Sequence, residues 1–358
     1  MQNTVMLKKP RLMNPILIVA WPGMGEVALK CASYLVEHLK AEAFAYMDSA
    51  NYFYPMASKI KNGIINTKEL PQSYFYYWKN PECGLFLKTA AASRSGASMK
   101  GQIRHPDIKL GLKEVPNDLI IFLSNAQPDL SKAYDYVNNI LEVARLYKVK
   151  TIISFAAMPA PIDHTHMPGV WFSATDKELF KYLEKSALKP MGEGEISGMN
   201  GLFLGLAKKN GFSGFCLLGE IPIYTIQIEN PRAVFAILER LKNILGLPLV
   251  LGDLEKQARF IEGEINKLVD YLKEGIALPG GGPGPISDAE IEKIKKSLSR
   301  LTHLPQSVKQ NIEKLFDLAK KDISKANELK QELDKWTVYK EYEDRFLDLF
   351  KKPKDKDN

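Results

Sequence analysis

The sequence predicts an α/β fold, in which helices cover both faces of a mostly parallel sheet and an all-helical extension follows. The first 250 residues alternate short apolar runs with segments whose apolar residues recur at helical spacing. The apolar runs show no polar alternation, which is typical of strands buried on both faces. After a stretch rich in glycine and proline at 277–287, the rest of the sequence shows only helical patterns.

The elements of the α/β part follow one another in the order that such a sheet needs. Strands are predicted at 16–21, 43–48, 74–78, 117–124, 149–157 and 214–219. Helices are predicted from Gly25 to Leu39, at 130–147 and at 231–247, where apolar residues recur every three or four positions. Asn62-Gly63 is a strong turn signal and predicts a hairpin ahead of the aromatic strand 74–78.

Composition shifts divide the chain into successive parts. We expect an α/β domain over 1–250 with an irregular insertion at about 80–115, a helix at 251–276, a linker at 277–287, a helical module at 288–350 and a disordered tail at 351–358. Ser287 and Glu290 have the spacing of a capping box at the start of the module. Apolar residues from Val308 to Trp336 keep a helical spacing, which predicts one long helix with a narrow apolar seam.

Charge and cysteine content narrow the function classes. The net charge of +7 is spread along the chain and mixed with acidic residues, so no nucleic-acid partner is expected. The three cysteines are far apart and form no CxxC pair, which argues against a disulfide framework and a zinc site. The longest apolar stretches are too short to span a bilayer and the N-terminus lacks an apolar signal core, so we expect no membrane partner and a cytoplasmic protein.

The opening stretch ILIVAWPGMGEVA (16–28) has two interpretations. The spacing Gly23-x-Gly25-x-x-Ala28, after a strand and before a helix, fits a loose dinucleotide fingerprint, and Asp48 could hold a ribose. Alternatively it is a tight strand-to-helix turn, and Pro22 removes one amide that a phosphate would need.

Polar residues that follow other strands could complete a ligand crevice, because ligands of open α/β sheets bind beyond the carboxyl ends of the strands. The candidate crevice residues are Gly23, Gly25, Asn125, Gln127, Asp163, Ser197 and Asn200. Asp163 with His164 and His166 is a weak metal signal, and the stretch also fits a proline-stiffened loop with a hydrogen-bonded Asp. Ser197 and Asn200 could start an anion-binding helix, and the plainer interpretation is a capped helix start. The sequence contains no GxSxG, Walker or HExxH motif, so no catalytic residue, metal or cofactor is assigned.

Five stretches together carry a resemblance to a known family. They are AWPGMGEVA (20–28), ATDKEL (174–179), EISGMNGLFLGLA (195–207), CLLGEIP (216–222) and NPRAVFAILERLKNILGL (230–247). In order and spacing, over about residues 12–250, the sequence resembles prokaryotic members of the second proteasome assembly chaperone family, PAC2. The resemblance implies a phosphorylase-like, Rossmann-like domain that forms homo-oligomers. Its motif positions here are Asp176, Gly198, Gly201, Gly219 and Glu220.

The chain departs from the family pattern at several points. Ala156-Ala157 stands where the family usually has glycine, and Asn230 stands where it usually has aspartate. Relatives that dock on proteasomes are expected to end in a hydrophobic residue, tyrosine and any residue, whereas this sequence ends Lys356-Asp357-Asn358. Docking through the C-terminus is therefore not expected.

The residues and the resemblance together lead to two hypotheses. The first is a non-enzymatic assembly chaperone or scaffold that acts as a homo-oligomer, a trimer being one candidate state, with its C-terminal helices as the site for a protein partner. The alternative is a nucleotide-binding or nucleoside-processing enzyme that uses the crevice at the carboxyl ends of the strands.

Overall fold

The computed structural model describes residues 3–54, 58–61, 64–67, 70–83, 116–186, 188–276, 306–335 and 339–350. The chain divides into two compact units, Met1–Ala258 and Arg259–Asn358, each of which is described by itself. The expected linker at 277–287, the capping box, the tail at 351–358 and all of the expected insertion beyond residue 83 lie outside the described residues.

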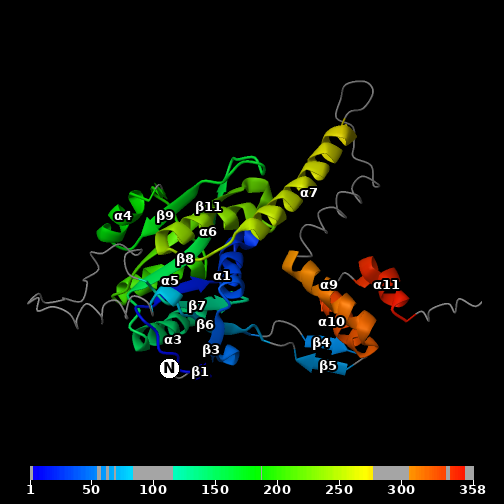
Figure 1. Ribbon diagram of the computed structural model, residues 1–358, viewed down its shortest axis with the longest axis horizontal. Coiled ribbons are helices and arrows are strands. Elements are labelled where there is room, and N and C mark those ends of the chain that lie inside the picture. The colour runs from blue at the N-terminus through cyan, green and yellow to red at the C-terminus, as the bar shows by residue number, and fades with distance from the viewer. Residues whose placement is uncertain are drawn as a thin grey trace, which may run out of the picture. The chain divides into compact units, whose positions relative to one another are not determined.

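The first unit is built on a nine-stranded sheet in the order β1-β3-β6-β7-β2-β8-β11-β9-β10. Figure 1 shows its central strands between helices. The strands are β1 (Thr4–Met6), β2 (Ile16–Ala20), β3 (Glu42–Met47), β6 (Ser73–Trp78), β7 (Leu119–Ser124), β8 (Thr151–Ala160), β9 (Val170–Ala174), β10 (Lys189–Pro190) and β11 (Ser213–Pro222). The predicted α/β class is confirmed.

Parallel pairing is concentrated at the centre of this sheet. β2 pairs in parallel with β7 and β8, and β8 pairs in parallel with β11 over ten residues. On the flanks β6, β3 and β1 join antiparallel to their neighbours, and β9 joins antiparallel to β11. The three strands β1, β9 and β10 were not predicted. β1 and β10 are only three and two residues long, and the apolar run of β9 stops after Phe172.

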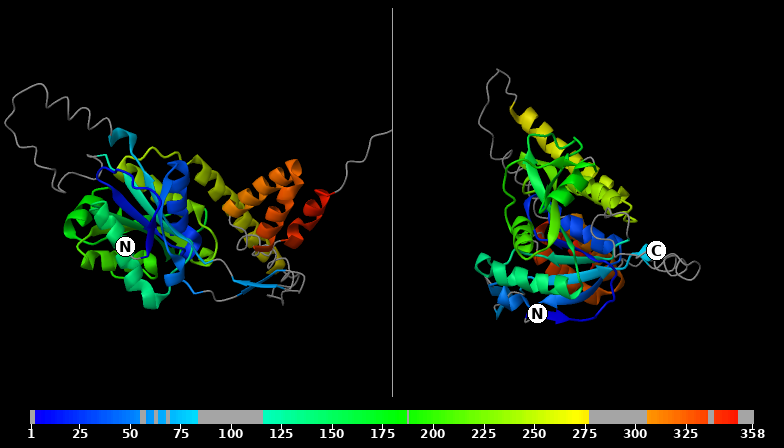
Figure 2. Two further views of the ribbon diagram at one scale, coloured as in Figure 1. Left: turned by 90° about the horizontal axis from the view of Figure 1, so that it is seen from below. Right: turned by 90° about the vertical axis from the view of Figure 1, so that its left-hand side faces the viewer.

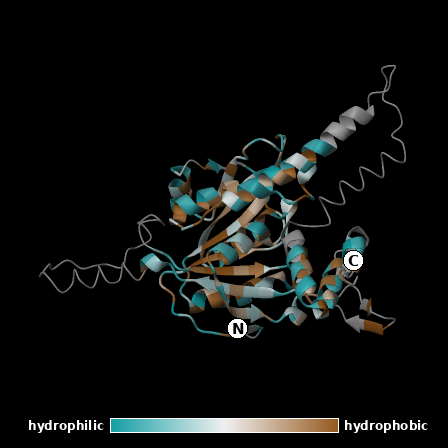
Figure 3. Ribbon diagram, turned by 45° about the vertical axis from the view of Figure 1, so that its right-hand side comes forward, coloured by the Kyte–Doolittle hydropathy of each residue, from teal (hydrophilic) through white to brown (hydrophobic). Residues whose placement is uncertain are grey.

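Two apolar cores form because the side chains of β2 alternate between the faces of the sheet. Ile16 and Ile18 face the core under α1 (Val27–His38) and α6 (Pro231–Leu245). Leu17 and Val19 face the core under α3 (Ala133–Leu146) and α5 (Met199–Lys209). Helices therefore cover both faces, as predicted, and Figure 3 shows the apolar strands between them. A further helix, α4 (Lys177–Glu184), contacts β9.

The predicted hairpin is present as a separate two-stranded sheet. β4 (Ser58–Lys61) pairs antiparallel with β5 (Ile64–Thr67), and the turn residues 62–63 lie outside the described residues. Figures 1 and 2 show this hairpin standing away from the nine-stranded sheet.

The second unit is helical. It holds most of α7 (Gly252–Ile276), followed by α9 (Gln306–Lys321), α10 (Ala326–Lys335) and α11 (Tyr339–Asp348). The predicted single helix from Val308 to Trp336 is wrong, because the chain breaks at Asp322. Its side chain accepts the Ser324 amide at 3.0 Å and starts a short 3-10 turn, η5 (Ile323–Lys325). The apolar seam closes on itself, with Phe316, Leu329 and Phe346 in one buried cluster.

Candidate functional site

The carboxyl ends of β2, β7, β8 and β11 meet at one edge of the sheet because these four strands are parallel. The loops that follow them hold most of the residues predicted to form the crevice. We call this edge the carboxyl edge.

Asn200 ties the start of α5 to the end of β2. Its side-chain oxygen accepts the Trp21 amide at 3.0 Å, and its side-chain nitrogen donates to the Trp21 carbonyl at 3.1 Å. Asn200 is buried, so both polar atoms need the partners that they have. Both polar groups of the Asn200 side chain are therefore bonded to the Trp21 main chain and hold the start of α5 to the end of β2.

Gln127 makes a second link across the same loops. Its side-chain nitrogen donates to the Pro22 carbonyl at 2.6 Å, and its side-chain oxygen accepts the Met199 amide at 3.1 Å. That amide belongs to the first turn of α5, so Gln127 caps the helix from another loop. Ser197 is exposed and does not cap α5, whose N-cap residue is Gly198 with a φ of 72°.

The loop after β2 is folded against the loop after β11. The Gly25 amide donates to the Ile226 carbonyl at 2.8 Å, and the Gly25 carbonyl accepts the Asn230 amide at 2.9 Å. Gly25 has a φ of 60°, which glycine adopts readily. A pyrophosphate in this loop would compete with the carbonyl that already holds the Gly25 amide. This geometry is that of the tight turn, the second interpretation of the opening stretch.

Asn125 and Asp163 lie in the loops after β7 and β8, on either side of the loop after β2. Each bonds to residues near it rather than to that loop. Asn125 exchanges two hydrogen bonds with the main chain of Gln72, at 2.9 and 3.2 Å. Asp163 accepts the amide and hydroxyl of Thr165 at 2.9 and 2.6 Å, and these bonds lower its pKa. The structure therefore gathers Gly23, Gln127 and Asn200 around Trp21 and Pro22, and leaves Asn125 and Asp163 outside that cluster.

Large apolar side chains point outward from the loops of the carboxyl edge. The Tyr224 hydroxyl accepts the His164 amide at 3.0 Å and lies 2.8 Å from His164 Nδ1, which joins the loops after β8 and β11. The exposed fractions are 37% for Met24, 60% for Met167, 55% for Ile223 and 56% for Tyr224. We call these four residues the edge surface. Exposed apolar residues from neighbouring loops are typical of a protein-binding surface.

A buried chain of polar groups supports this edge and was missed from the sequence. Trp21 Nε1 donates to the Tyr136 hydroxyl at 3.3 Å, which lies 2.9 Å from Ser73 Oγ. Ser73 Oγ donates to Ser124 Oγ at 2.9 Å, and Ser124 Oγ donates to the Ala126 carbonyl at 2.8 Å. Burial raises the pKa of Tyr136. Four separate elements supply these groups, so no local sequence pattern signals them.

The described residues offer little nucleophilic or metal-binding chemistry. Burial raises the pKa of Cys31 well above its usual value, and raises those of Cys83 and Cys216 to about 12. A thiol reacts as its thiolate, so all three are poor nucleophiles at neutral pH. Within the described part of the chain, no group of three or more His, Cys, Asp or Glu side chains lies close enough to hold a metal ion. Nor is any helix there long and apolar enough to cross a membrane.

A family model described as the PAC2 family matches residues 17–269, which is more than half of the chain. The chain belongs to the PAC2 family. The predicted resemblance is confirmed, and the match covers all of the loops at the carboxyl edge.

Relatives of this PAC2 protein include curated and structurally solved proteins. An uncharacterised protein of Methanocaldococcus jannaschii, MJ1210, is 26% identical over 286 residues, covering 79% of this chain and 93% of the relative. Pyrococcus furiosus PbaB, an archaeal proteasome activator, is 25% identical with a TM-score of 0.56, covering 75% of this chain and 100% of that one. A PAC2 family protein of Streptomyces avermitilis shares the fold at 18% identity, with a TM-score of 0.53 and coverage of 72% and 96%.

The motif positions of this PAC2 protein have structural contacts. Asp176 caps α4 by accepting the amides of Glu178 and Leu179 at 3.1 and 2.9 Å. Glu220 accepts the Gly169 amide at 2.7 Å and the Trp171 indole at 2.8 Å. Gly201 and Gly219 lie where a Cβ would be 2.1 Å from the Ile196 carbonyl and 3.1 Å from Ile237.

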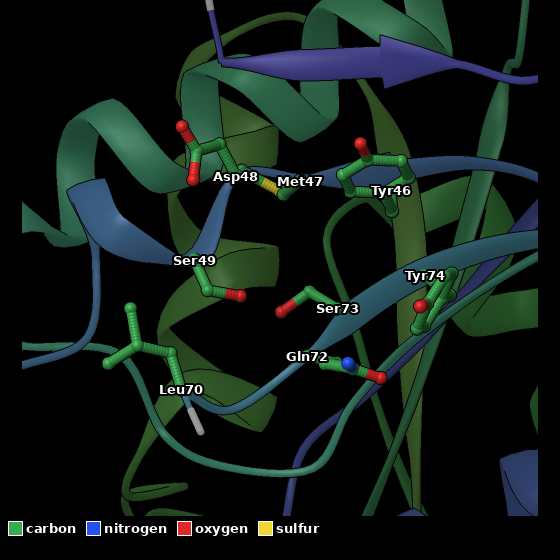
Figure 4. A pocket seen from close by; sticks show the side chains of 8 residues that line it. All are labelled: Tyr46, Met47, Asp48, Ser49, Leu70, Gln72, Ser73 and Tyr74. Carbon is green, nitrogen blue, oxygen red and sulfur yellow. The ribbon is translucent and has the colours of Figure 1, made fainter. Parts of the chain in front are cut away.

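A hollow of about 370 Å³ opens beside the end of β3, as Figure 4 shows. β3 runs in the same direction as β7, since both are antiparallel to β6, so the hollow lies at the carboxyl edge as well. It is lined by Tyr46, Met47, Asp48, Ser49, Leu70, Gln72, Ser73 and Tyr74. The hydroxyls of Ser49 and Ser73 are bonded to the Pro71 carbonyl and to Ser124, and the lining mixes these polar groups with the rings of Tyr46 and Tyr74.

Proposed function

We propose that this PAC2 protein acts on other proteins, as a non-enzymatic assembly chaperone or scaffold that works as a homo-oligomer. The observation that carries the proposal is the contrast at the carboxyl edge between bonded polar side chains and exposed apolar ones. Polar side chains there, above all Asn200 and Gln127, bond to the protein's own main chain, while the four residues of the edge surface are exposed. An enzyme of this fold class needs convergent polar groups at this place.

The partner that we propose is the proteasome of the host organism. PbaB, at 25% identity over its full length, is an archaeal proteasome activator. A surface of methionine, isoleucine and tyrosine suits such a partner, because flexible and amphipathic side chains adapt to another protein's surface. The helical unit offers a second apolar surface, at Leu318, Ile323, Leu347 and Phe350.

The test is native mass spectrometry of the full chain mixed with purified proteasome α-subunits of its own organism. We expect a complex that Ile223→Lys weakens at least tenfold. Leu146→Lys is the matched control, because Leu146 is exposed to a similar extent, 53% against 55%, but ends α3 at the opposite edge of the sheet.

Two results would overturn the proposal. One is the absence of any complex at concentrations of tens of micromolar. The other is a stoichiometric small molecule that co-purifies and is lost on Gly25→Val, which would favour the nucleotide-binding alternative instead.

A further inference from the structure

Tyr224 is a member of the edge surface whose orientation is fixed by hydrogen bonds. Its hydroxyl accepts the His164 amide at 3.0 Å and lies 2.8 Å from His164 Nδ1. The two rings stand nearly perpendicular, with their centroids 6.0 Å apart. His164 is buried, whereas Tyr224 is 56% exposed. The hydroxyl is therefore held toward the protein, and the ring is the part of the side chain that a partner can contact.

Asp163 places a negative charge beside this ring. Its Oδ1 accepts the hydroxyl and the amide of Thr165, and these bonds lower the pKa of the carboxyl, so it is ionised at neutral pH. Burial raises the pKa of Tyr224, the bond from the His164 amide lowers that pKa in part, and the charge of Asp163 raises it further. The other carboxylate oxygen, Oδ2, lies 3.8 Å from His164 Nδ1, beyond hydrogen-bond distance, and the Asp163 side chain is half exposed. Asp163 is thus able to accept a hydrogen bond from another molecule.

The loops of the carboxyl edge are acidic although the whole chain has a net charge of +7. In the loops 21–26, 125–132, 161–169 and 223–230 the charged residues apart from histidine are Glu26, Asp129, Lys132, Asp163 and Glu229. Glu229 is paired with Lys30 at 2.7 Å, and burial raises the pKa of Glu26. Asp129 and Asp163 both have lowered pKa values, and of these two Asp163 is the one beside an exposed ring of the edge surface. A basic partner suits such an edge better than an acidic one.

An exposed aromatic ring beside a carboxylate attracts a cation in two ways. The face of a tyrosine ring attracts the ammonium group of lysine or, more often, the guanidinium group of arginine. The carboxylate forms charge-assisted hydrogen bonds with the same cation. Arginine fits both groups at once, because its planar guanidinium stacks on a ring while its N–H groups donate to a carboxylate. Met167 and Ile223, which are exposed in the same two loops, supply apolar surface for the aliphatic part of such a side chain.

We infer that Asp163 and Tyr224 together receive one basic side chain, an arginine or a lysine, of the protein partner, and that His164 is the positioning residue that holds the Tyr224 ring for it. The inference rests on the proposed function and names the chemistry of the partner at the edge surface. An apolar surface by itself accepts many partners, whereas a carboxylate beside a fixed ring selects for a cation at one place.

The first test measures the dissociation constant of the complex with proteasome α-subunits of the same organism, by calorimetry at about 0.05 M and about 0.3 M salt. Asp163→Asn should weaken the complex about tenfold at the lower salt concentration and less at the higher one, because it removes one charge of an ion pair. Asparagine keeps an oxygen for the Thr165 amide, so the loop should keep its fold. Asp129→Asn is the matched control, since Asp129 lies at the same edge and accepts the Ser131 amide and hydroxyl in the same way, at 2.7 and 2.6 Å. It should weaken the complex less than about twofold.

The second test asks whether Asp163 and Tyr224 act on the same cation. Tyr224→Leu keeps an apolar side chain but removes the ring, and should weaken the complex about fivefold. The double variant Asp163→Asn/Tyr224→Leu should lose less than the product of the two single losses, because each single variant already disturbs the shared contact.

The third test concerns His164. His164→Leu removes the ring nitrogen next to the Tyr224 hydroxyl, and should weaken the complex about threefold because the freed ring has to be ordered on binding. His164→Asn places a polar atom near the position of Nδ1 and should restore the affinity. Urea denaturation of both variants is the control, since a purely structural role would change their stability without separating their affinities.

The outcomes separate this inference from the proposed function. A complex that Ile223→Lys weakens, but that Asp163→Asn weakens no more than Asp129→Asn does, overturns the cation site alone. Wild-type affinity of Tyr224→Leu, or a double variant whose loss equals the product of the single losses, overturns it as well. Equal affinities of His164→Leu and His164→Asn overturn the positioning role. The absence of any complex with the wild-type chain overturns the proposed function and the cation site together.

Discussion

At the scale of single residues, two glycines of the same helix carry opposite constraints. A Cβ at position 201 would lie 2.1 Å from the Ile196 carbonyl oxygen, whereas a Cβ at position 205 would meet nothing within 4 Å. Gly201→Ala should therefore lower the free energy of unfolding by about 2 to 3 kcal/mol through overpacking. Gly205→Ala should raise it by about 0.5 to 1 kcal/mol, because alanine is the better helix former. Urea denaturation of both variants measures the difference, and equal effects would contradict the packing of α5 on residue 196.

Glu26 makes stability depend on pH. It is a non-glycine residue with a φ of 54° at the start of α1. Burial raises the pKa of its carboxyl, the charge of Lys30 lowers that pKa in part, and the charge of Glu229 raises it further. The folded state therefore favours the protonated form, and its stability falls as the pH rises from below the ordinary carboxyl pKa through the raised value. Glu26→Gln should remove this decrease in the free energy of unfolding with rising pH.

The measurement is the free energy of unfolding by urea from pH 4 to pH 8. The variant should match the wild type at the acid end and exceed it at neutral pH, by less than about 1 kcal/mol because the carboxyl is only partly buried. Glu42→Gln is the control of opposite sign, since the hydrogen bond from Lys8 lowers the pKa of Glu42. A Glu26→Gln variant that is less stable than the wild type at pH 7 would show that the charge is favourable in the folded protein.

At the scale of elements, the strands that sequence predicts well are those buried on both faces. β2, β7, β8 and β11 contain uninterrupted apolar runs, and their predicted ranges lie within about three residues of the observed ones. A continuous apolar run of this length, with turn residues at its ends, favours a buried strand over a helix. The edge strand β1 and the short β10 carry no such run, because an edge strand is half solvated and takes its pairing from its neighbour.

Helix ends were harder to predict because their capping groups come from elsewhere. Gln127 caps α5 from a position 72 residues earlier, so the local sequence pointed to Ser197 instead. The break at Asp322 is local, yet the apolar spacing continues through it and hides it. A helical period alone does not distinguish one long helix from two helices that pack on each other.

The candidate crevice stays a prediction, and the hydrogen bonds of its residues did not follow from the sequence. The carboxyl edge followed from strand order, and Gly23, Gln127 and Asn200 do meet there. That Asn200 and Gln127 bond to main chain depends on distances between loops far apart in sequence. Asn230 illustrates the same limit, since it caps α6 through Ala233 and also donates to Thr225, which an aspartate could not do.

At the scale of the whole molecule, the two units have separate apolar cores. The cores on the two faces of the sheet draw on residues from Ile16 to Leu254, and the core of the helical unit draws on residues from Ile312 to Phe346. No buried residue of the described chain belongs to a cluster of both units. Units with their own cores are able to fold independently.

A chain shortened to residues 1–276 should therefore fold and keep the assembly of the full chain. We expect one cooperative unfolding transition with an unchanged urea midpoint, because the cores of the first unit are complete. Native mass spectrometry should show the same number of subunits as the full chain, since the part of the chain that matches the PAC2 family lies mostly in the first unit. A folded but monomeric 1–276 chain would instead show that the contact between copies needs residues beyond 276. A chain that fails to unfold cooperatively would show that the first unit depends on residues beyond 276.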